Sequence, residues 1–234
     1  MVPFEEWSVE VMCRHIAQRS VFEAHSEYLY HKGVGRGRVL LLRGDLLLIS
    51  AMVEMRDRRV QGVELQDAVT LATQRLFPSV LDGLEMREEG TIETAMRVGY
   101  TDTIFQRSPA FRNHVRIILV SIMTSAQAAM TSAAMRMMRY LSRGETGQVI
   151  SIDLGMQREG QDASAQLYYN GFAQKGISVQ TADRVIIIDP INATGGSFCK
   201  AIGCAKQAGA QENQIFLCSL FATVQGVRAV YEEF

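Results

Sequence analysis

The sequence lacks any long apolar run and any large excess of one charge. No run of apolar residues approaches the about 20 that a membrane-spanning helix needs. The formal net charge of −1 argues against broad electrostatic binding of nucleic acid, although it leaves room for a local basic patch. With 47% hydrophobic and 21% charged residues, the 234-residue chain is predicted to form a soluble globular protein with one sizeable domain plus additions.

Signals for export, disulfide formation and metal binding are also missing. The N-terminus has no signal-peptide core and no transit-peptide pattern, and whether a transit peptide has been removed stays open. The cysteines lack CxxC spacing and the four histidines lack metal-ligand spacing. Three of the cysteines lie in segments predicted to be core, so we expect buried free thiols. We therefore predict an intracellular protein, in the mitochondrial matrix or the cytoplasm, that holds no metal and needs no cofactor of its own. The four cysteines are Cys13, Cys199, Cys204 and Cys218.

The most informative stretch, RVIIIDPINATGGSFCKAIGC, covers residues 184–204. Its β-branched run at 184–188 is too short for a helix and predicts a buried parallel strand. The Asp189-Pro190 pair ends that strand, because proline cannot donate a hydrogen bond to a sheet. A loop of small residues follows, and then we expect a helix from about Ser197 to Ala208, capped by Gly209.

Such a loop favours anion binding. Gly195 and Gly196 let the backbone approach a phosphate closely, and the first amides of the helix point toward it along a favourable dipole. The hydroxyls of Thr194 and Ser197 add donors, while Asp189, at the carboxyl end of the strand, is placed to accept hydrogen bonds from sugar hydroxyls. The Gly-Lys-Ser/Thr of a Walker loop does not follow. An ordinary strand, glycine turn and helix without a ligand is the alternative that the loop alone leaves open.

These residues resemble a known family. IIIDPINATGGS resembles the phosphoribosyl-diphosphate loop of type I phosphoribosyltransferases, and its Asp-Pro pair followed by Ala-Thr-Gly-Gly-Ser resembles the uracil phosphoribosyltransferases in particular. The resemblance is strong over residues 184–234 and weaker back to about Met55. It implies that Asp189 holds the ribose hydroxyls and that Ala193 to Ser197 wrap the 5′-phosphate. It also implies that Mg²⁺ accompanies phosphoribosyl diphosphate if the protein is active.

Apolar and helical patterns predict an α/β fold. Two helical patterns, at 63–77 and 128–141, lie among buried apolar runs, which predicts a doubly wound, mainly parallel sheet of the phosphoribosyltransferase type. Pro78 is expected to end or kink the first of these helices. The parallel strands are predicted at about 115–123, 149–156, 184–189 and 214–221.

Additions to this sheet are expected at two places. Residues 85–105 predict a β-hairpin, and the resemblance implies that it is an arm that joins subunits. Residues 1–38 are predicted to form an N-terminal extension, with an amphipathic helix at about Phe4–Ser20 and a glycine-containing linker. The phosphoribosyltransferase-like domain is therefore expected over residues 39–234.

Two loops differ from the resembled family. Where the family has Arg-Ala-Gly to hold pyrophosphate, this chain has Thr124-Ser125-Ala126. A charge-assisted phosphate contact is thereby lost, and Ala126 adds a Cβ where the backbone must come close. Where the family has Arg-Asp-Glu and then Thr in a flexible loop, this chain keeps Arg158 and Glu159 but lacks the second acid and the threonine.

The segment that binds uracil in the family is not found before Phe234. The family continues with a further strand and a Tyr-Ile-Val-Pro-Gly-x-Gly-Asp hood, and no Pro-Gly pair occurs in this chain. We therefore expect no uracil hood, and we assign no residue a catalytic role, because a site without those groups cannot discriminate a base.

Three functional hypotheses follow. The first is a uracil-phosphoribosyltransferase-like protein that has lost catalysis and serves as a structural or regulatory subunit of a larger assembly, such as a mitochondrial ribonucleoprotein. It implies protein partners in a homodimer or heteromeric assembly, RNA contact only within that assembly, and a loop that either binds a phosphorylated small ligand or persists for packing. The second is an active phosphoribosyltransferase that makes uridine monophosphate from uracil in nucleotide salvage. The third is a sensor that binds a nucleotide or phosphoribosyl diphosphate without turnover.

Overall fold

The computed structural model describes residues 46–84, 87–98, 102–111, 115–123, 126–142, 148–157 and 165–234. Several sequence predictions lie outside these residues. They concern the N-terminal extension 1–38, the pair Thr124-Ser125 and the pair Arg158-Glu159.

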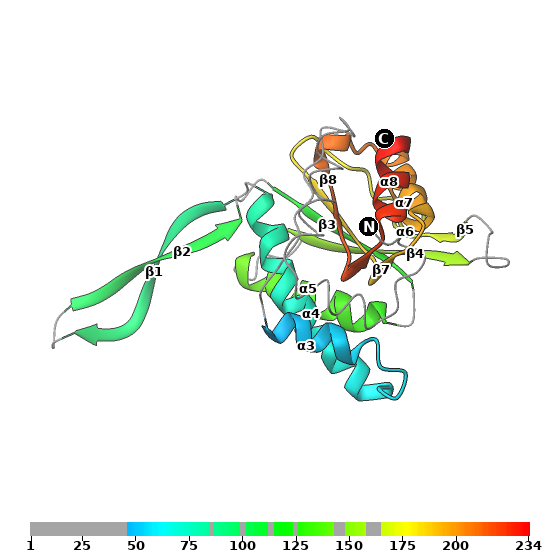
Figure 1. The fold of residues 1–234 in the computed structure, drawn as a ribbon. Coiled ribbons are helices and arrows are strands. Elements are labelled where there is room, and N and C mark those ends of the chain that lie inside the picture. The colour runs from blue at the N-terminus through cyan, green and yellow to red at the C-terminus, as the bar shows by residue number, and fades with distance from the viewer. Residues whose placement is uncertain are drawn as a thin grey trace.

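The centre of the fold is a five-stranded sheet (Figure 1) with the strand order β5-β4-β3-β6-β8. Strands β4, β3, β6 and the edge strand β8 run parallel, and β5 pairs antiparallel with β4 at the opposite edge. The predicted parallel sheet is therefore confirmed. The bounds of the strands are β3 Ile117–Ile122, β4 Val149–Gln157, β5 Gln166–Asn170, β6 Arg184–Ile188 and β8 Ile215–Cys218.

Helices cover both faces of this sheet, as Figure 1 shows. Alternate residues of β3 and β6 point to opposite faces, because side chains along a strand alternate. Ile117 and Ile186 pack toward α3 (Leu46–Glu54), α4 (Gly62–Gly83) and α5 (Gln127–Leu141). Ile118 and Val185 pack toward α6 (Gly171–Lys175) and α7 (Gly196–Gln207). The final helix, α8 (Val224–Glu233), packs against α7.

A long hairpin projects from one end of the molecule (Figure 1). It consists of β1 (Arg87–Val98) and β2 (Asp102–Phe111), which pair antiparallel with an irregularity in register between Glu93 and Arg97. The predicted hairpin at 85–105 is confirmed, and its second strand extends further along the chain than expected.

Two expected boundaries differ in the structure. Of the two alternatives for Pro78, an end of the helix is wrong, because α4 continues to Gly83; a kink at this residue stays a prediction. Phe77 and Leu81 are both buried on either side of the proline, and their packing outweighs the one intrahelical hydrogen bond that the proline removes.

The expected strand at 214–221 is divided in two. Gln214 belongs to a short 3₁₀ turn, and β8 ends at Cys218. The amides of Leu220 and Phe221 both donate to the Pro190 carbonyl, at 3.2 and 3.0 Å. This draws the chain away from the sheet into β9 (Phe221–Ala222), which pairs in parallel with β7 (Ile191–Asn192).

Candidate anion-binding site

The strand order has its topological switch point between β3 and β6. From β3 the chain continues to β4 on one side, whereas from β6 it continues to β8 on the other side. The two loops therefore leave the sheet in opposite directions, and ligands of open α/β sheets bind at the carboxyl ends of such strands. These are the two loops that the sequence analysis selected for phosphate and pyrophosphate binding.

Asp189 lies directly after β6 and is held inside the fold. Only 5% of the residue is exposed. Its amide donates to the Cys218 carbonyl at 3.1 Å, and its carboxylate Oδ1 accepts from the Ile191 amide at 3.3 Å. The backbone on both sides of Asp189 is thus fixed to the neighbouring segment. Its role toward ribose hydroxyls stays a prediction.

The anion loop, residues 193–197, ends where α7 begins. Gly195 precedes the helix with φ +82°, a left-handed conformation that glycine adopts without strain. The first bond of the helix runs from the Cys199 amide to the Gly195 carbonyl at 2.9 Å. As at any helix start, the amides before Cys199 have no intrahelical acceptor, and their partial positive charge attracts anions. Phosphate binding by this loop stays a prediction.

The loop is open on one side and covered on the other. Thr194 is exposed and Ser197 is half-buried, while Gly195 is buried against α8. Hydrogen bonds from Thr223, the N-cap of α8, go to carbonyl oxygens of this segment. Asn192 O accepts from the Thr223 amide at 2.9 Å, and Ala193 O accepts from the Thr223 hydroxyl. These contacts use carbonyl oxygens, so they occupy none of the loop's amide donors.

On the other side of the switch point, the described residues of β3, β4 and α5 form a neutral and acidic hydrogen-bonded group. The Gln127 side chain donates to Thr131 Oγ1 at 3.3 Å and to Asp153 Oδ1 at 3.4 Å. Ser121 Oγ lies 2.7 Å from Thr131 Oγ1. Ala126, half-buried, precedes α5 and supplies no side-chain cap.

The hydrogen-bonded group of Ser121, Gln127, Thr131 and Asp153 was not predicted from the sequence. The available signal was a serine and an aspartate inside otherwise apolar strands, at Ser121 in β3 and Asp153 in β4, which the register places side by side. The predicted pyrophosphate and flexible-loop residues Thr124, Ser125, Arg158 and Glu159 lie outside the described residues.

The described residues offer neither a metal-binding cluster nor a membrane-spanning helix. Within them, no group of three or more His, Cys, Asp or Glu side chains is placed to hold a metal ion. The same part of the chain contains no helix both long and apolar enough to cross a membrane.

A doubly wound sheet with a glycine-containing anion loop at its switch point is the architecture of phosphoribosyltransferases. The family model described as uracil phosphoribosyltransferase matches residues 45–234. The chain therefore belongs to the uracil phosphoribosyltransferase family.

Individual relatives match over shorter stretches. A uracil phosphoribosyltransferase of Mycoplasma capricolum is 49% identical over 49 residues, which are 21% of this chain and 23% of the relative. A uracil phosphoribosyltransferase of Limosilactobacillus fermentum is 43% identical over 54 residues, 23% of this chain and 26% of the relative. These matches span about a quarter of each relative's length.

Among solved structures, the AQ2163 protein from Aquifex aeolicus has a similar fold. It aligns with a TM-score of 0.63 at 17% identity, over 84% of this chain and 82% of that chain.

Proposed function

We propose that this family member binds the 5′-phosphate of a phosphoribosyl ligand at residues 193–197 but has largely lost transfer to uracil, and that it serves as a structural or regulatory subunit. The contrast between the two sides of the switch point carries this proposal. The start of α7 offers amides that have no intrahelical acceptor and the hydroxyl of Ser197, whereas the hydrogen-bonded group formed by Ser121, Gln127 and Asp153 on the other side is neutral and acidic.

Weak pyrophosphate binding follows from this contrast. The carboxylate of Asp153 repels an anion, and Thr124-Ser125-Ala126 supplies no cation where the resembled family has an arginine. A guanidinium can donate two parallel, charge-assisted hydrogen bonds to one phosphate, and no neutral side chain replaces this interaction. Removing one such group that stabilises developing charge lowers a rate by about 10²- to 10³-fold.

Comparison of two ligands tests the lost pyrophosphate contact. Calorimetry should give similar affinities for ribose 5-phosphate and for phosphoribosyl diphosphate with Mg²⁺, because only the shared 5′-phosphate is held well. The double variant Thr124→Arg/Ala126→Gly should raise the affinity for phosphoribosyl diphosphate alone. Gln207→Arg adds the same charge at the exposed far end of α7 and is the matched control. A wild-type chain that strongly prefers phosphoribosyl diphosphate contradicts the proposal.

A single substitution tests the loop itself. Ser197→Asp places a negative charge in the first turn of α7, where it suits the helix dipole but repels phosphate. We expect this variant to fold with unchanged or slightly higher stability and to lose ribose 5-phosphate binding. Ser197→Ala removes one donor and should weaken binding only modestly. Equal binding by Ser197→Asp would place the ligand elsewhere.

Turnover separates this proposal from the salvage-enzyme alternative. With uracil, phosphoribosyl diphosphate and Mg²⁺, we expect uridine monophosphate formation to be undetectable or many orders of magnitude below ordinary enzymatic turnover, which is about 1–10³ per second. A rate within that range would establish an active phosphoribosyltransferase. Binding without turnover would also fit a ligand sensor, so the subunit role must be tested separately by measuring whether the chain associates.

A further inference from the structure

The anion loop is joined to α8 by a continuous seam of contacts. The seam begins where β7 pairs with β9, at Ile191–Phe221 and Asn192–Ala222. It continues through Thr223, the N-cap of α8, and ends where Ala229 faces Gly195. We propose that α8 positions the anion loop through Thr223 and Gly226, which are positioning residues for phosphate binding. This inference rests on the proposed function in assuming that the loop binds a phosphate.

Thr223 links the helix and the loop through one hydroxyl group. Its oxygen accepts from the Gly226 amide at 2.9 Å and so caps the start of α8. The same hydroxyl donates its proton to the Ala193 carbonyl. The Thr223 amide donates to Asn192 O at 2.9 Å. A change in the position of α8 therefore acts directly on the two residues that precede Thr194.

Gly226 allows α8 to approach the loop at backbone distance. A Cβ built on this glycine would lie 2.5 Å from Asn192 O, 2.6 Å from Asn192 Oδ1 and 3.0 Å from Ala193 O. Two of these atoms are backbone and cannot rotate away. Gly226 is helical, so the requirement for glycine is one of space and not of backbone conformation.

The loop contributes a glycine of its own at the same contact. A Cβ on Gly195 would meet Ala229 Cβ at 2.7 Å and Gly226 O at 2.8 Å, and its φ of +82° disfavours any side chain. Small residues from both partners thus bring the backbone of α8 against the residue that precedes α7. Because Gly195 sets the direction of the first α7 amides, its contact with α8 fixes where those donors point.

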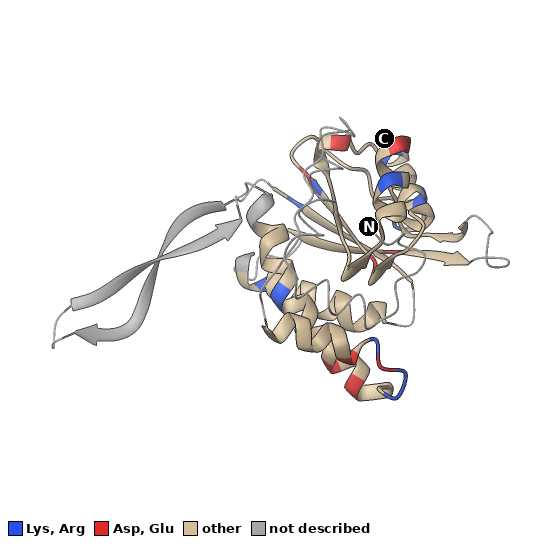
Figure 2. Cartoon of the chain, in the orientation of Figure 1, with Lys and Arg blue, Asp and Glu red and all other residues tan. Residues whose placement is uncertain are grey.

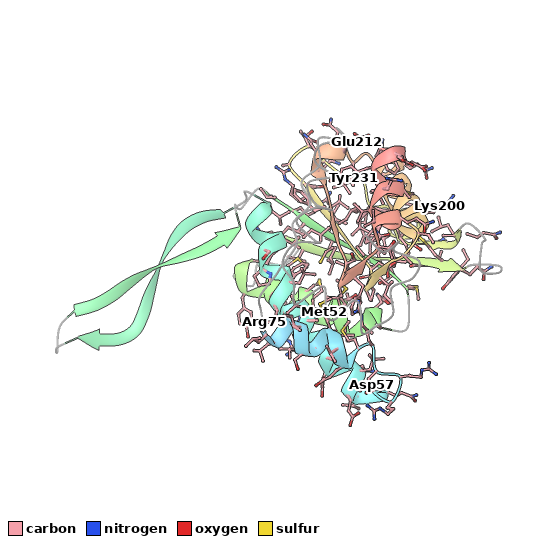
Figure 3. The ribbon with its side chains drawn as sticks, in the orientation of Figure 1. Met52, Asp57, Arg75, Lys200, Glu212 and Tyr231 are labelled. Atoms are coloured by element: carbon pink, nitrogen blue, oxygen red, sulfur yellow. The ribbon has the colours of Figure 1, made fainter. Side chains whose placement is uncertain are left out.

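A buried oxygen at the seam makes the packing sensitive to change. Asn192 is 7% exposed, and its Oδ1 has no hydrogen-bond partner in the structure. A buried acceptor without a partner already costs free energy. An added methyl group on Gly226 would press on this side-chain oxygen and on the backbone oxygens of Asn192 and Ala193. Because the backbone oxygens cannot rotate away, the loop must shift relative to α8. Figure 3 labels Tyr231 on α8 and Lys200 on α7, the helix that follows the anion loop.

Matched glycine variants test the inference. Gly226→Ala should weaken ribose 5-phosphate binding about tenfold or more, the equivalent of one lost hydrogen bond. It should also speed hydrogen–deuterium exchange at residues 192–198 in the ligand-free protein. Gly203→Ala is the control, because it lies in α7 and its added Cβ has nothing within 4 Å. That variant should leave both affinity and loop exchange unchanged.

A second pair keeps the inference testable if Gly226→Ala does not fold. Thr223→Val preserves shape but removes the hydroxyl, and it should weaken ribose 5-phosphate binding and speed exchange at residues 192–198. Thr223→Ser retains the hydroxyl and should restore both. Exchange within β3 is the internal reference, because a local effect of α8 on the loop leaves this central strand protected. Similar acceleration in β3 and the loop would show general destabilisation and overturn a positioning role.

The outcomes separate this inference from the proposed function. If the wild-type chain does not bind ribose 5-phosphate, the proposed function fails, and the ligand-free exchange data still decide whether α8 holds the loop. If wild-type chain binds and both Gly226→Ala and Thr223→Val bind equally well with unchanged loop exchange, the positioning inference is wrong and the proposed function stands.

Discussion

The contribution of an ion pair to stability depends on how deeply its charges are buried, as the pairs Arg116–Asp183 and Arg59–Asp57 show. Arg116 Nε lies 3.2 Å from both carboxylate oxygens of Asp183. The Asp183 side chain is only 4% exposed and also accepts from the Gln180 amide at 2.8 Å. Arg59 and Asp57 lie on the surface, with 89% of the Arg59 side chain exposed. The hydrogen bond from Arg59 lowers the pKa of Asp57 to about 2, but water screens this pair.

We expect Arg116→Met to be strongly destabilising. It leaves the Asp183 carboxylate buried without its cation, and breaking a buried pair in this way costs about 3–5 kcal/mol. Arg59→Met is the matched control and should change stability little. Urea denaturation of both variants measures the difference. Similar midpoints for the two variants would show that Asp183 finds solvent or another partner.

The buried thiol of Cys218 makes the free energy of unfolding fall at alkaline pH. Burial raises the pKa of the Cys218 thiol from 9.0 to about 12. Above pH 9 the unfolded chain loses this proton while the folded chain keeps it, so stability is fully present below pH 9 and falls toward pH 12. The slope due to this thiol is about 1.4 kcal/mol per pH unit. Urea denaturation from pH 8 to 11 should show a shallower decline for Cys218→Ala than for wild type, and parallel declines would contradict the assignment.

Among the secondary-structure elements, the sequence best predicts those whose side chains all lie in the same environment. β3 and β6 are buried on both faces, so their apolar runs are continuous and identify parallel strands without tertiary information. The start of α7 is equally local, because two glycines and a serine mark it. These are the features that lead from the sequence to the anion loop.

Other elements depend on contacts that no local pattern records. The α3 sequence LLLISAMVE is apolar on its exposed side as well as its buried side, so no helical period distinguishes it. β5 lies at the sheet edge, where QLYYN mixes polar and apolar residues. The contact between Asn192 and Gly226 joins segments far apart in the sequence, and a glycine inside a helix gives no sign of what approaches it.

For the whole molecule, the main unexplained feature is an apolar surface on α3. Leu46 is 81% exposed, Ile49 37% and Val53 56%, and their spacing of three and four residues places them on one side of the helix. Val63, at the start of α4, is 71% exposed. The connection that follows α3 carries three arginines and one aspartate (Figure 2), so charged residues of mainly positive sign come directly after this helix. Patches of this kind are typical of protein interaction sites, so we expect a partner to cover it.

The projecting hairpin points to association as well. An isolated two-stranded hairpin is marginally stable in water, so β1 and β2 gain from a partner that packs along them. In the described residues these strands pair only with each other. Together with the α3 surface, this supports the subunit role that we propose, with a second copy of the chain or another protein as the partner.

The last prediction tests that role directly. We expect the isolated chain to self-associate or aggregate at high concentration in light scattering, because the α3 surface stays exposed without a partner. Leu46→Gln/Val53→Gln replaces two exposed apolar side chains and should shift the chain toward monomer without lowering its stability, since neither side chain belongs to the core. Tyr168→Gln removes an exposed aromatic residue on edge strand β5 and should leave association unchanged. A wild-type chain that remains a soluble monomer at high concentration, with no partner recovered from its native source, would remove the case for a structural subunit, because the exposed surface would then need no cover.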